Sequence, residues 1–136
     1  MNSHPDPAPT AWIATADEDL TAARDLMACG SGSHRVLCFC CQQAAEKYLK
    51  ALLVKVGLPV PKTHDLVAIM MALGPFIPDV EQLSATDAAW LTGFAVGARY
   101  PLPPAMAVTG EHADRALAIA QTIKQFCLAE ITSNAK

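Results

Sequence analysis

Apolar residues recur at intervals of three and four along most of this chain of 136 residues. That interval places them on one side of an α-helix. The pattern predicts helices at residues 11–28, 34–56, 64–73, 83–99 and 111–131. Clusters of glycine, proline and serine end helices, and such clusters follow the first four: GSGS, GLPVP, GPFIP and YPLPP.

No stretch combines strict apolar–polar alternation with hairpin turns, so the pattern predicts no β-sheet. The fold class is therefore all-α. Its simplest form is an up-and-down antiparallel bundle of four long helices and one short helix. We predict one domain at residues 10–132, a flexible lead-in at residues 1–9 and a tail at residues 133–136.

The composition of the chain predicts a contact between subunits. Hydrophobic residues make up 52% of the chain and charged residues 17%, which is more apolar than an average soluble domain. No apolar run reaches the ~18–20 residues that a membrane-spanning helix needs. The surplus apolar surface therefore predicts a subunit contact, most simply a homodimer, and no membrane association.

Charge is unevenly distributed along the chain. The net charge of −3 argues against a general nucleic-acid coat. Residues 47–64 contain no acid, however, and they include Lys47, Lys50, Lys55 and Lys62. These cations either attract an anionic ligand or complement the C-terminus of a helix. The N-terminus has no secretory pattern, so we expect a cytoplasmic protein whose five cysteines are reduced thiols.

The cysteines leave two interpretations open. His34, Cys38 and Cys41 follow one another at i, i+4 and i+7, so they can share one side of the second helix. A zinc site needs a fourth ligand, which Cys127, Cys29 or His64 would have to supply, although the spacing does not require it. Cysteine is also a common small core residue. We predict core thiols, with no metal and no cofactor.

A set of polar residues occupies the arc of the second helix that its apolar residues leave free. The simplest interpretation is a solvated helix side, supported by an i, i+4 pair of Glu46 and Lys50. The alternative is a ligand-binding surface, because the following segment PKTHDL adds Lys62 and His64 near the end of the same helix. The polar residues of the helix are Gln42, Gln43, Glu46, Lys47 and Lys50.

Arg99 and Tyr100 form another candidate, at the end of the fourth predicted helix. An arginine there either binds a phosphate or carboxylate in a bidentate manner or satisfies the last helix carbonyls. The chain contains no GxxxxGK[ST], GxGxxG, HExxH or GxSxG motif. The residues alone therefore predict no enzyme.

The order of motifs resembles the HEPN family (higher eukaryotes and prokaryotes nucleotide-binding domain). The motifs are ADEDLTAARDLM, then QQAAEKYLKALL followed by PKTHDL, then ARYP and an alanine-rich last helix. The resemblance spans about residues 12–128. It implies a helical bundle similar to the C-terminal domain of kanamycin nucleotidyltransferase, usually dimeric. Members often act with a minimal nucleotidyltransferase, many of them as toxin–antitoxin pairs.

Many members of the family are metal-independent ribonucleases with an Arg-x(4–6)-His motif, which this chain matches only in part. Arg99 supplies the arginine, but positions 104–106 are proline, alanine and methionine, and His112 is too far along. Cys40 also stands where relatives commonly have histidine in FHxQQAAEK. The resemblance thus favours a non-catalytic subunit over a divergent ribonuclease toxin.

We therefore predict a non-catalytic, dimeric subunit that binds a nucleotide, an RNA or a minimal nucleotidyltransferase partner. Its lysines and Arg99 would contact phosphate, and Gln43 and Glu46 would bond to a base, a sugar or the partner chain. A purely structural dimerisation module is the remaining alternative. The predicted binding residues are Gln43, Glu46, Lys47, Lys50, Lys62, His64, Arg99 and Tyr100.

Overall fold

The computed structural model describes residues 6–97 and 107–133. Within these ranges every regular element is a helix, so the predicted all-α class is confirmed. The elements are α1 (Pro9–Cys29), α2 (His34–Lys55), α3 (Leu66–Leu73), the short 3₁₀ helix η1 (Pro78–Gln82), α4 (Ala85–Thr92), α5 (Phe94–Gly97) and α6 (Gly110–Thr132).

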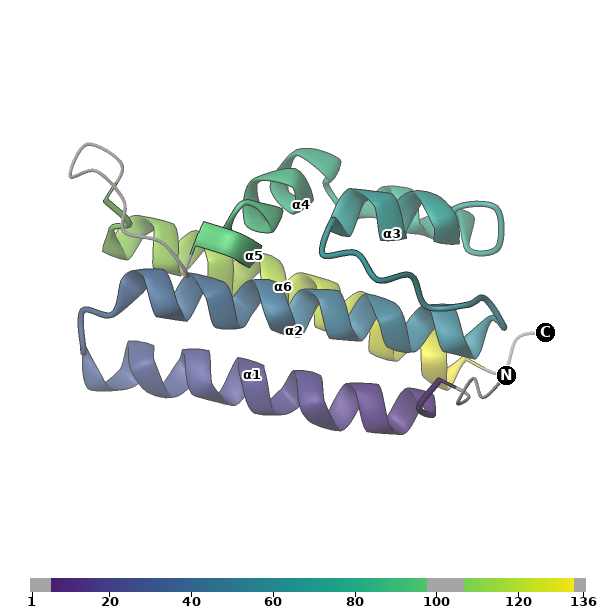
Figure 1. Ribbon diagram of the computed structural model, residues 1–136, viewed down its shortest axis with the longest axis horizontal. Coiled ribbons are helices and arrows are strands. Elements are labelled where there is room, and N and C mark those ends of the chain that lie inside the picture. Colours follow the sequence, from purple (N-terminus) through teal and green to yellow (C-terminus); the bar gives the residue numbers. More distant parts are fainter. Residues whose placement is uncertain (1–5, 98–106, 134–136) are drawn as a thin grey trace.

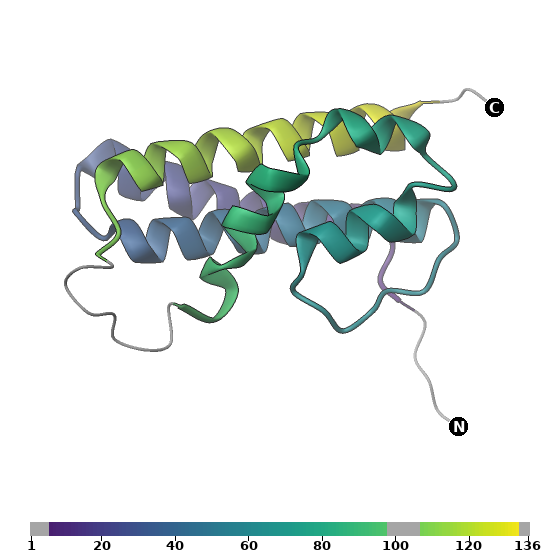
Figure 2. The same cartoon turned by 90° about the horizontal axis from the view of Figure 1, so that it is seen from above.

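Three long helices form the body of the bundle. Helix α2 packs against both α1 and α6, and α1 runs in the direction opposite to the other two (Figure 1). The shorter elements lie along the remaining side of α2, where η1, α4 and α5 return the chain toward the start of α6 (Figure 2). None of the described helices is both long enough and apolar enough to cross a membrane.

Among the described helices, α2 contributes the largest number of buried residues. Its leucines meet apolar side chains from every neighbouring helix, and this burial is the main source of stability in a bundle of this size. Gly30 ends α1 at a φ of 62°, a left-handed conformation that suits glycine. The largest core residues include Leu20, Tyr48, Leu49, Leu52, Leu53, Leu66, Ile69, Leu73 and Leu91.

The fourth predicted helix, residues 83–99, is not one continuous helix. Helix α4 ends at Thr92, a turn follows at Gly93, and α5 has four residues. Glycine weakens a helix interior, and the last residue of α4 makes a tertiary contact: the Thr92 hydroxyl accepts from the Leu66 N–H at 3.1 Å, while it donates to the Ala88 carbonyl of its own helix at 2.8 Å. The bundle therefore has three long helices, not four.

Candidate functional site

The polar side of α2 is largely buried. Gln42, Glu46 and Lys50 are 0%, 5% and 6% exposed, and Gln43 and Lys47 are half-buried. The segment that joins α2 to α3 lies over this part of the helix, because His64 contacts both Gln42 and Glu46. The interpretation of this arc as a solvated helix side is therefore wrong.

Glu46 is the centre of the buried cluster. Its Oε2 accepts from Lys50 Nζ at 2.7 Å, one helical turn along α2. Its Oε1 lies 2.8 Å from His64 Nδ1 and 3.3 Å from Gln42 Nε2. A carboxylate oxygen only accepts, so Nδ1 of His64 carries the proton. Three donating groups, one of them the Lys50 ammonium, thus compensate a carboxylate that is almost completely removed from water.

Gln42 links the helix to the segment before α3. Its Nε2 donates to the backbone carbonyl of His64 at 3.0 Å as well as to Glu46, and its Oε1 accepts from Gln43 Nε2 at 2.7 Å. Both amide hydrogens and the amide oxygen are used, as a buried glutamine requires. Sequence reasoning left Gln42 out of the binding residues, although its i, i+4 spacing to Glu46 was the available signal.

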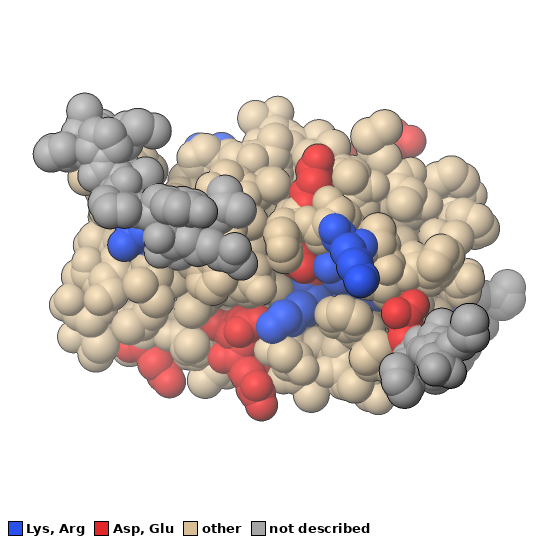
Figure 3. Space-filling model, in the orientation of Figure 1, with Lys and Arg blue, Asp and Glu red and all other residues tan. Residues whose placement is uncertain are grey.

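The remaining lysines have separate surroundings. Lys47 Nζ lies 2.8 Å from Asp19 Oδ2 of α1, and both side chains are partly exposed. Lys62 is exposed, two residues before His64. Figure 3 shows basic side chains gathered over the middle of this face, with acidic side chains on either side. The surface that remains open to a ligand is therefore cationic but narrow.

The structure brings four of the predicted binding residues into one network, which contains Gln43, Glu46, Lys50 and His64. Lys47 pairs with α1 instead. Arg99 and Tyr100 lie outside the described residues. Glu46, Lys50 and the Gln42 amide make their contacts inside the network, so these three groups fit fastening the α2–α3 segment better than direct ligand binding.

A model of the HEPN domain matches residues 10–131. The chain belongs to the HEPN family. Among solved structures it is similar to TT1696 from Thermus thermophilus, with a TM-score of 0.76 and 28% identity over 90% of this chain and 97% of that one. It also shares its fold with ST0689, an archaeal HEPN homologue (TM-score 0.73, 24% identity, 93% and 100% covered). No curated protein sequence matches the chain.

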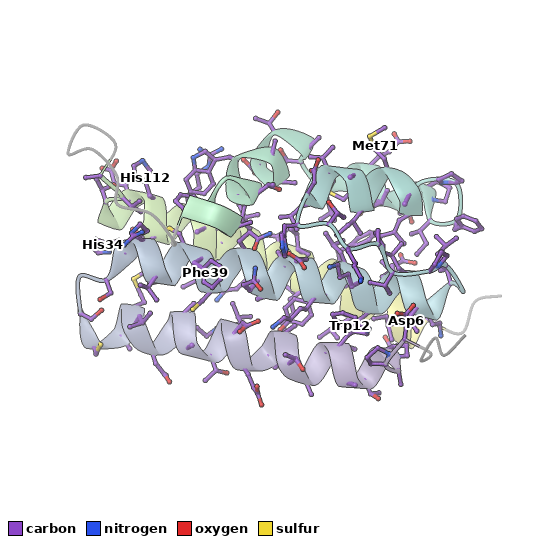
Figure 4. All side chains as sticks on the ribbon, in the orientation of Figure 1. Asp6, Trp12, His34, Phe39, Met71 and His112 are labelled. Atoms are coloured by element: carbon purple, nitrogen blue, oxygen red, sulfur yellow. The ribbon has the colours of Figure 1, made fainter. Side chains whose placement is uncertain are left out.

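Two histidines lie at the end of this HEPN bundle where α6 begins. Figure 4 places His34 and His112 there, at the end opposite Trp12. His112 Nδ1 accepts from the Thr109 N–H at 2.9 Å, and the Thr109 hydroxyl faces the His112 N–H, so the two residues form a capping box. The His112 side chain therefore caps the N-terminus of α6.

The cysteines of this HEPN chain are mostly core thiols. Cys38, Cys41 and Cys127 are buried. Burial raises the pKa of Cys38 to about 11, and burial followed by the neighbouring Cys38 and Cys40 raises the pKa of Cys41 to about 12. Burial also raises the pKa of Cys40, with a further contribution from Asp19. In the described ranges, no three His, Cys, Asp or Glu side chains are placed to share a metal ion.

These pKa shifts predict selective alkylation. With iodoacetamide at pH 8, the exposed Cys29 is expected to react first, and Cys38 and Cys41 about 100-fold or more slowly, because only the thiolate reacts and burial also blocks access. Raising the pH toward 11 should increase the thiolate fraction of Cys38. Peptide mass spectrometry gives the rates, with urea-unfolded protein as the control. Equal rates for Cys29 and Cys38 in the folded protein would contradict the prediction.

Proposed function

We propose that this HEPN chain is a non-catalytic, dimeric binding subunit that works with a minimal nucleotidyltransferase in a toxin–antitoxin pair and binds a nucleotide. The observation that carries the proposal is the closed network around Glu46. Its buried carboxylate is compensated by Lys50 and His64, so Glu46 and Lys50 are not available as an acid or a base to a substrate.

The capping role of His112 supports the same conclusion. Ribonuclease members of the family need a histidine separated from the arginine by four to six residues, and no histidine stands in that window after Arg99. His112 is the next histidine, and its Nδ1 accepts a backbone hydrogen bond. A general base needs a free lone pair within reach of the substrate. The ribonuclease alternative therefore gains no support from this residue.

Uncovered apolar side chains support a subunit contact. Met71 is 73% exposed and Phe76 is 55% exposed, and Met71 lies on the outer side of α3 (Figure 4). Methionine and aromatic side chains are enriched at protein–protein contacts. The proposal assigns this region to the dimer or to the nucleotidyltransferase partner.

Nucleotide binding at the cationic surface is tested by calorimetry with ATP, GTP and a short RNA. The Lys47→Ala, Lys62→Ala double variant is expected to bind about tenfold or more weakly, because each lysine supplies a charge-assisted contact to phosphate. Lys55→Ala is the matched control: Lys55 is also exposed, but it donates to the Ile131 carbonyl near the end of α6.

Two results would reject the proposal. One is a wild-type protein that binds none of the three ligands and does not associate with a minimal nucleotidyltransferase encoded beside it. The other is RNA cleavage by the purified protein that disappears in an Arg99→Ala variant, since that result would support the ribonuclease instead.

A further inference from the structure

The outer side of α3 carries no charged residue. From Leu66 to Pro78 every residue is apolar, glycine or proline. The exposed positions of α3 follow one another at i, i+3 and i+4, so they lie on one side of the helix, opposite the side that enters the core. A helix side that faces water normally holds charged and polar residues. The exposed residues of this stretch are Ala68, Met71, Ala72, Pro75, Phe76 and Pro78.

No described element covers this apolar surface. Helix α3 lies at the outer edge of the molecule, with α2 on its inner side (Figure 1). Among the described residues, Met71 and Phe76 are two of the three large apolar side chains that are exposed, and Val36 at the start of α2 is the third. A contiguous apolar surface of this kind marks a contact with another molecule. The charges at its edges indicate which molecule fits.

The two ends of the apolar surface have opposite charges. Lys62 is exposed before α3, and Asp79 and Glu81 are exposed after it, on η1. Asp65 also lies at the first end, but its carboxylate caps α3 by accepting from two N–H groups of the first turn at 3.0 and 3.3 Å. Within the described residues, Lys62, Asp79 and Glu81 form no ion pair. These three charges are therefore available to a partner.

A surface with one basic end and one acidic end is complementary to a copy of itself. A two-fold axis through the middle of α3 places Lys62 of each protomer at the end where the other protomer carries Asp79 and Glu81. A partner with a single sign of charge would meet like charge at one of the two ends. An anionic lipid surface would be repelled by Asp79 and Glu81. The arrangement of charges therefore favours a second copy of this chain.

We infer that two copies of this chain pack α3 against α3 in an antiparallel arrangement across a two-fold axis. The inference rests on the dimer of the proposed function, and it names the surface and the ion pairs that form it. Met71 and Phe76 of both copies lie at the centre of the contact. Lys62 of each copy pairs with Asp79 or Glu81 of the other at the rim. An apolar centre with a polar rim is the usual anatomy of a protein interface.

Sedimentation equilibrium measures the dissociation constant of the dimer for the wild type and for Met71→Glu. Met71 is 73% exposed in the single chain, so the change leaves the folded chain intact but buries an unpaired charge at two symmetric positions of the dimer. The dissociation constant is expected to rise about 100-fold or more. Ala68→Glu, one turn earlier on the same side of α3, should act in the same way. Thermal unfolding followed by circular dichroism checks that both variants fold.

Two further variants test the surface and the arrangement of the helices. Val36→Glu is the matched control, because Val36 is also a large exposed apolar residue but lies in the first turn of α2; it should dimerise like the wild type. Lys62→Glu is expected to weaken the dimer about tenfold, because it places like charges together at both rims. Reversing the opposite end as well, in the Lys62→Glu, Asp79→Lys, Glu81→Lys variant, should restore the wild-type dissociation constant to within about threefold.

A Met71→Glu dissociation constant equal to that of the wild type would overturn the inference and leave the proposed function intact, because the dimer would then use another surface. Dissociation of Val36→Glu in the same experiment would move the contact to the start of α2. A triple variant that does not regain association would overturn the antiparallel arrangement. A monomeric wild type would overturn the inference and the dimeric part of the proposed function. Calorimetry with ATP on Met71→Glu, which keeps Lys47 and Lys62, tests nucleotide binding separately.

Discussion

Replacing Glu46 with alanine is expected to lower the free energy of unfolding by about 3–5 kcal/mol, because the change leaves a buried ammonium group without its counter-charge. Lys50 is 6% exposed, and its Nζ lies 2.7 Å from the Glu46 carboxylate. The change also removes the acceptor that faces His64 Nδ1, so the segment before α3 loses one of its attachments. Urea unfolding followed by circular dichroism measures the effect.

A double-mutant cycle distinguishes the ion pair from simple packing. Lys50→Met alone leaves the buried carboxylate with only His64 and the Gln42 amide, and it should also destabilise the protein. The combined Glu46→Met, Lys50→Met variant is expected to lie within about 1–2 kcal/mol of the wild type, since apolar residues of similar volume often replace a buried pair without loss. A loss below about 1 kcal/mol for Glu46→Ala would show that Lys50 reaches water, contrary to its burial.

The ion pair of Glu46 and Lys50 limits which lysines can bind a phosphate. A phosphate that contacted Lys50 would have to displace Glu46 from it and His64 from Glu46. Lys62 needs no such rearrangement because it is exposed, and at Lys47 a phosphate would compete only with the partly exposed carboxylate of Asp19. The family motif QQAAEK thus has two parts: Gln42 and Glu46 fasten the α2–α3 segment, and Lys47 is directed toward α1 and the surface.

Helix positions could be predicted where the apolar repeat is long and the end signals are strong. The predicted 34–56 helix differs from α2 by one residue at its end, and the 11–28 and 111–131 helices differ from α1 and α6 by one or two residues at each end. The prediction of one continuous helix at residues 83–99 was wrong, because α4 ends at Thr92, whose hydroxyl contacts the start of α3. Local spacing carries no information about such a contact.

The burial of the polar arc on α2 could not be predicted for a similar reason. Periodicity shows which residues share a helix side, but it does not show what covers that side. The cover is the segment that contains His64, and its position depends on tertiary hydrogen bonds to Gln42 and Glu46. The spacing of Glu46 and Lys50 predicted that these two would pair, and the fold determined that they would pair out of water and together with Gln42.

Tyr48 joins the three long helices. Its ring is completely buried on α2, and its hydroxyl donates to Asp17 of α1. Asp17 Oδ1 also lies 3.1 Å from Lys124 Nζ of α6, whose ammonium group is 5.9 Å from the centre of the Tyr48 ring. Burial, followed by the hydrogen bond to Asp17, raises the pKa of Tyr48. The apolar spacing of α2 is consistent with a buried ring, but the partner of its hydroxyl required the fold.

Tyr48→Ala is expected to reduce the free energy of unfolding by about 3–5 kcal/mol, because it opens a cavity where α1, α2 and α6 meet. Tyr48→Phe keeps the ring and removes only the donor to Asp17, so it should cost about 1–2 kcal/mol. Urea unfolding of the two variants separates packing from hydrogen bonding. A Tyr48→Phe loss as large as that of Tyr48→Ala would contradict the packing argument and would assign the stability to the contact among Tyr48, Asp17 and Lys124. A small loss for both would mean that the helices repack around the cavity, since the cost of such a substitution depends on how far the site can collapse.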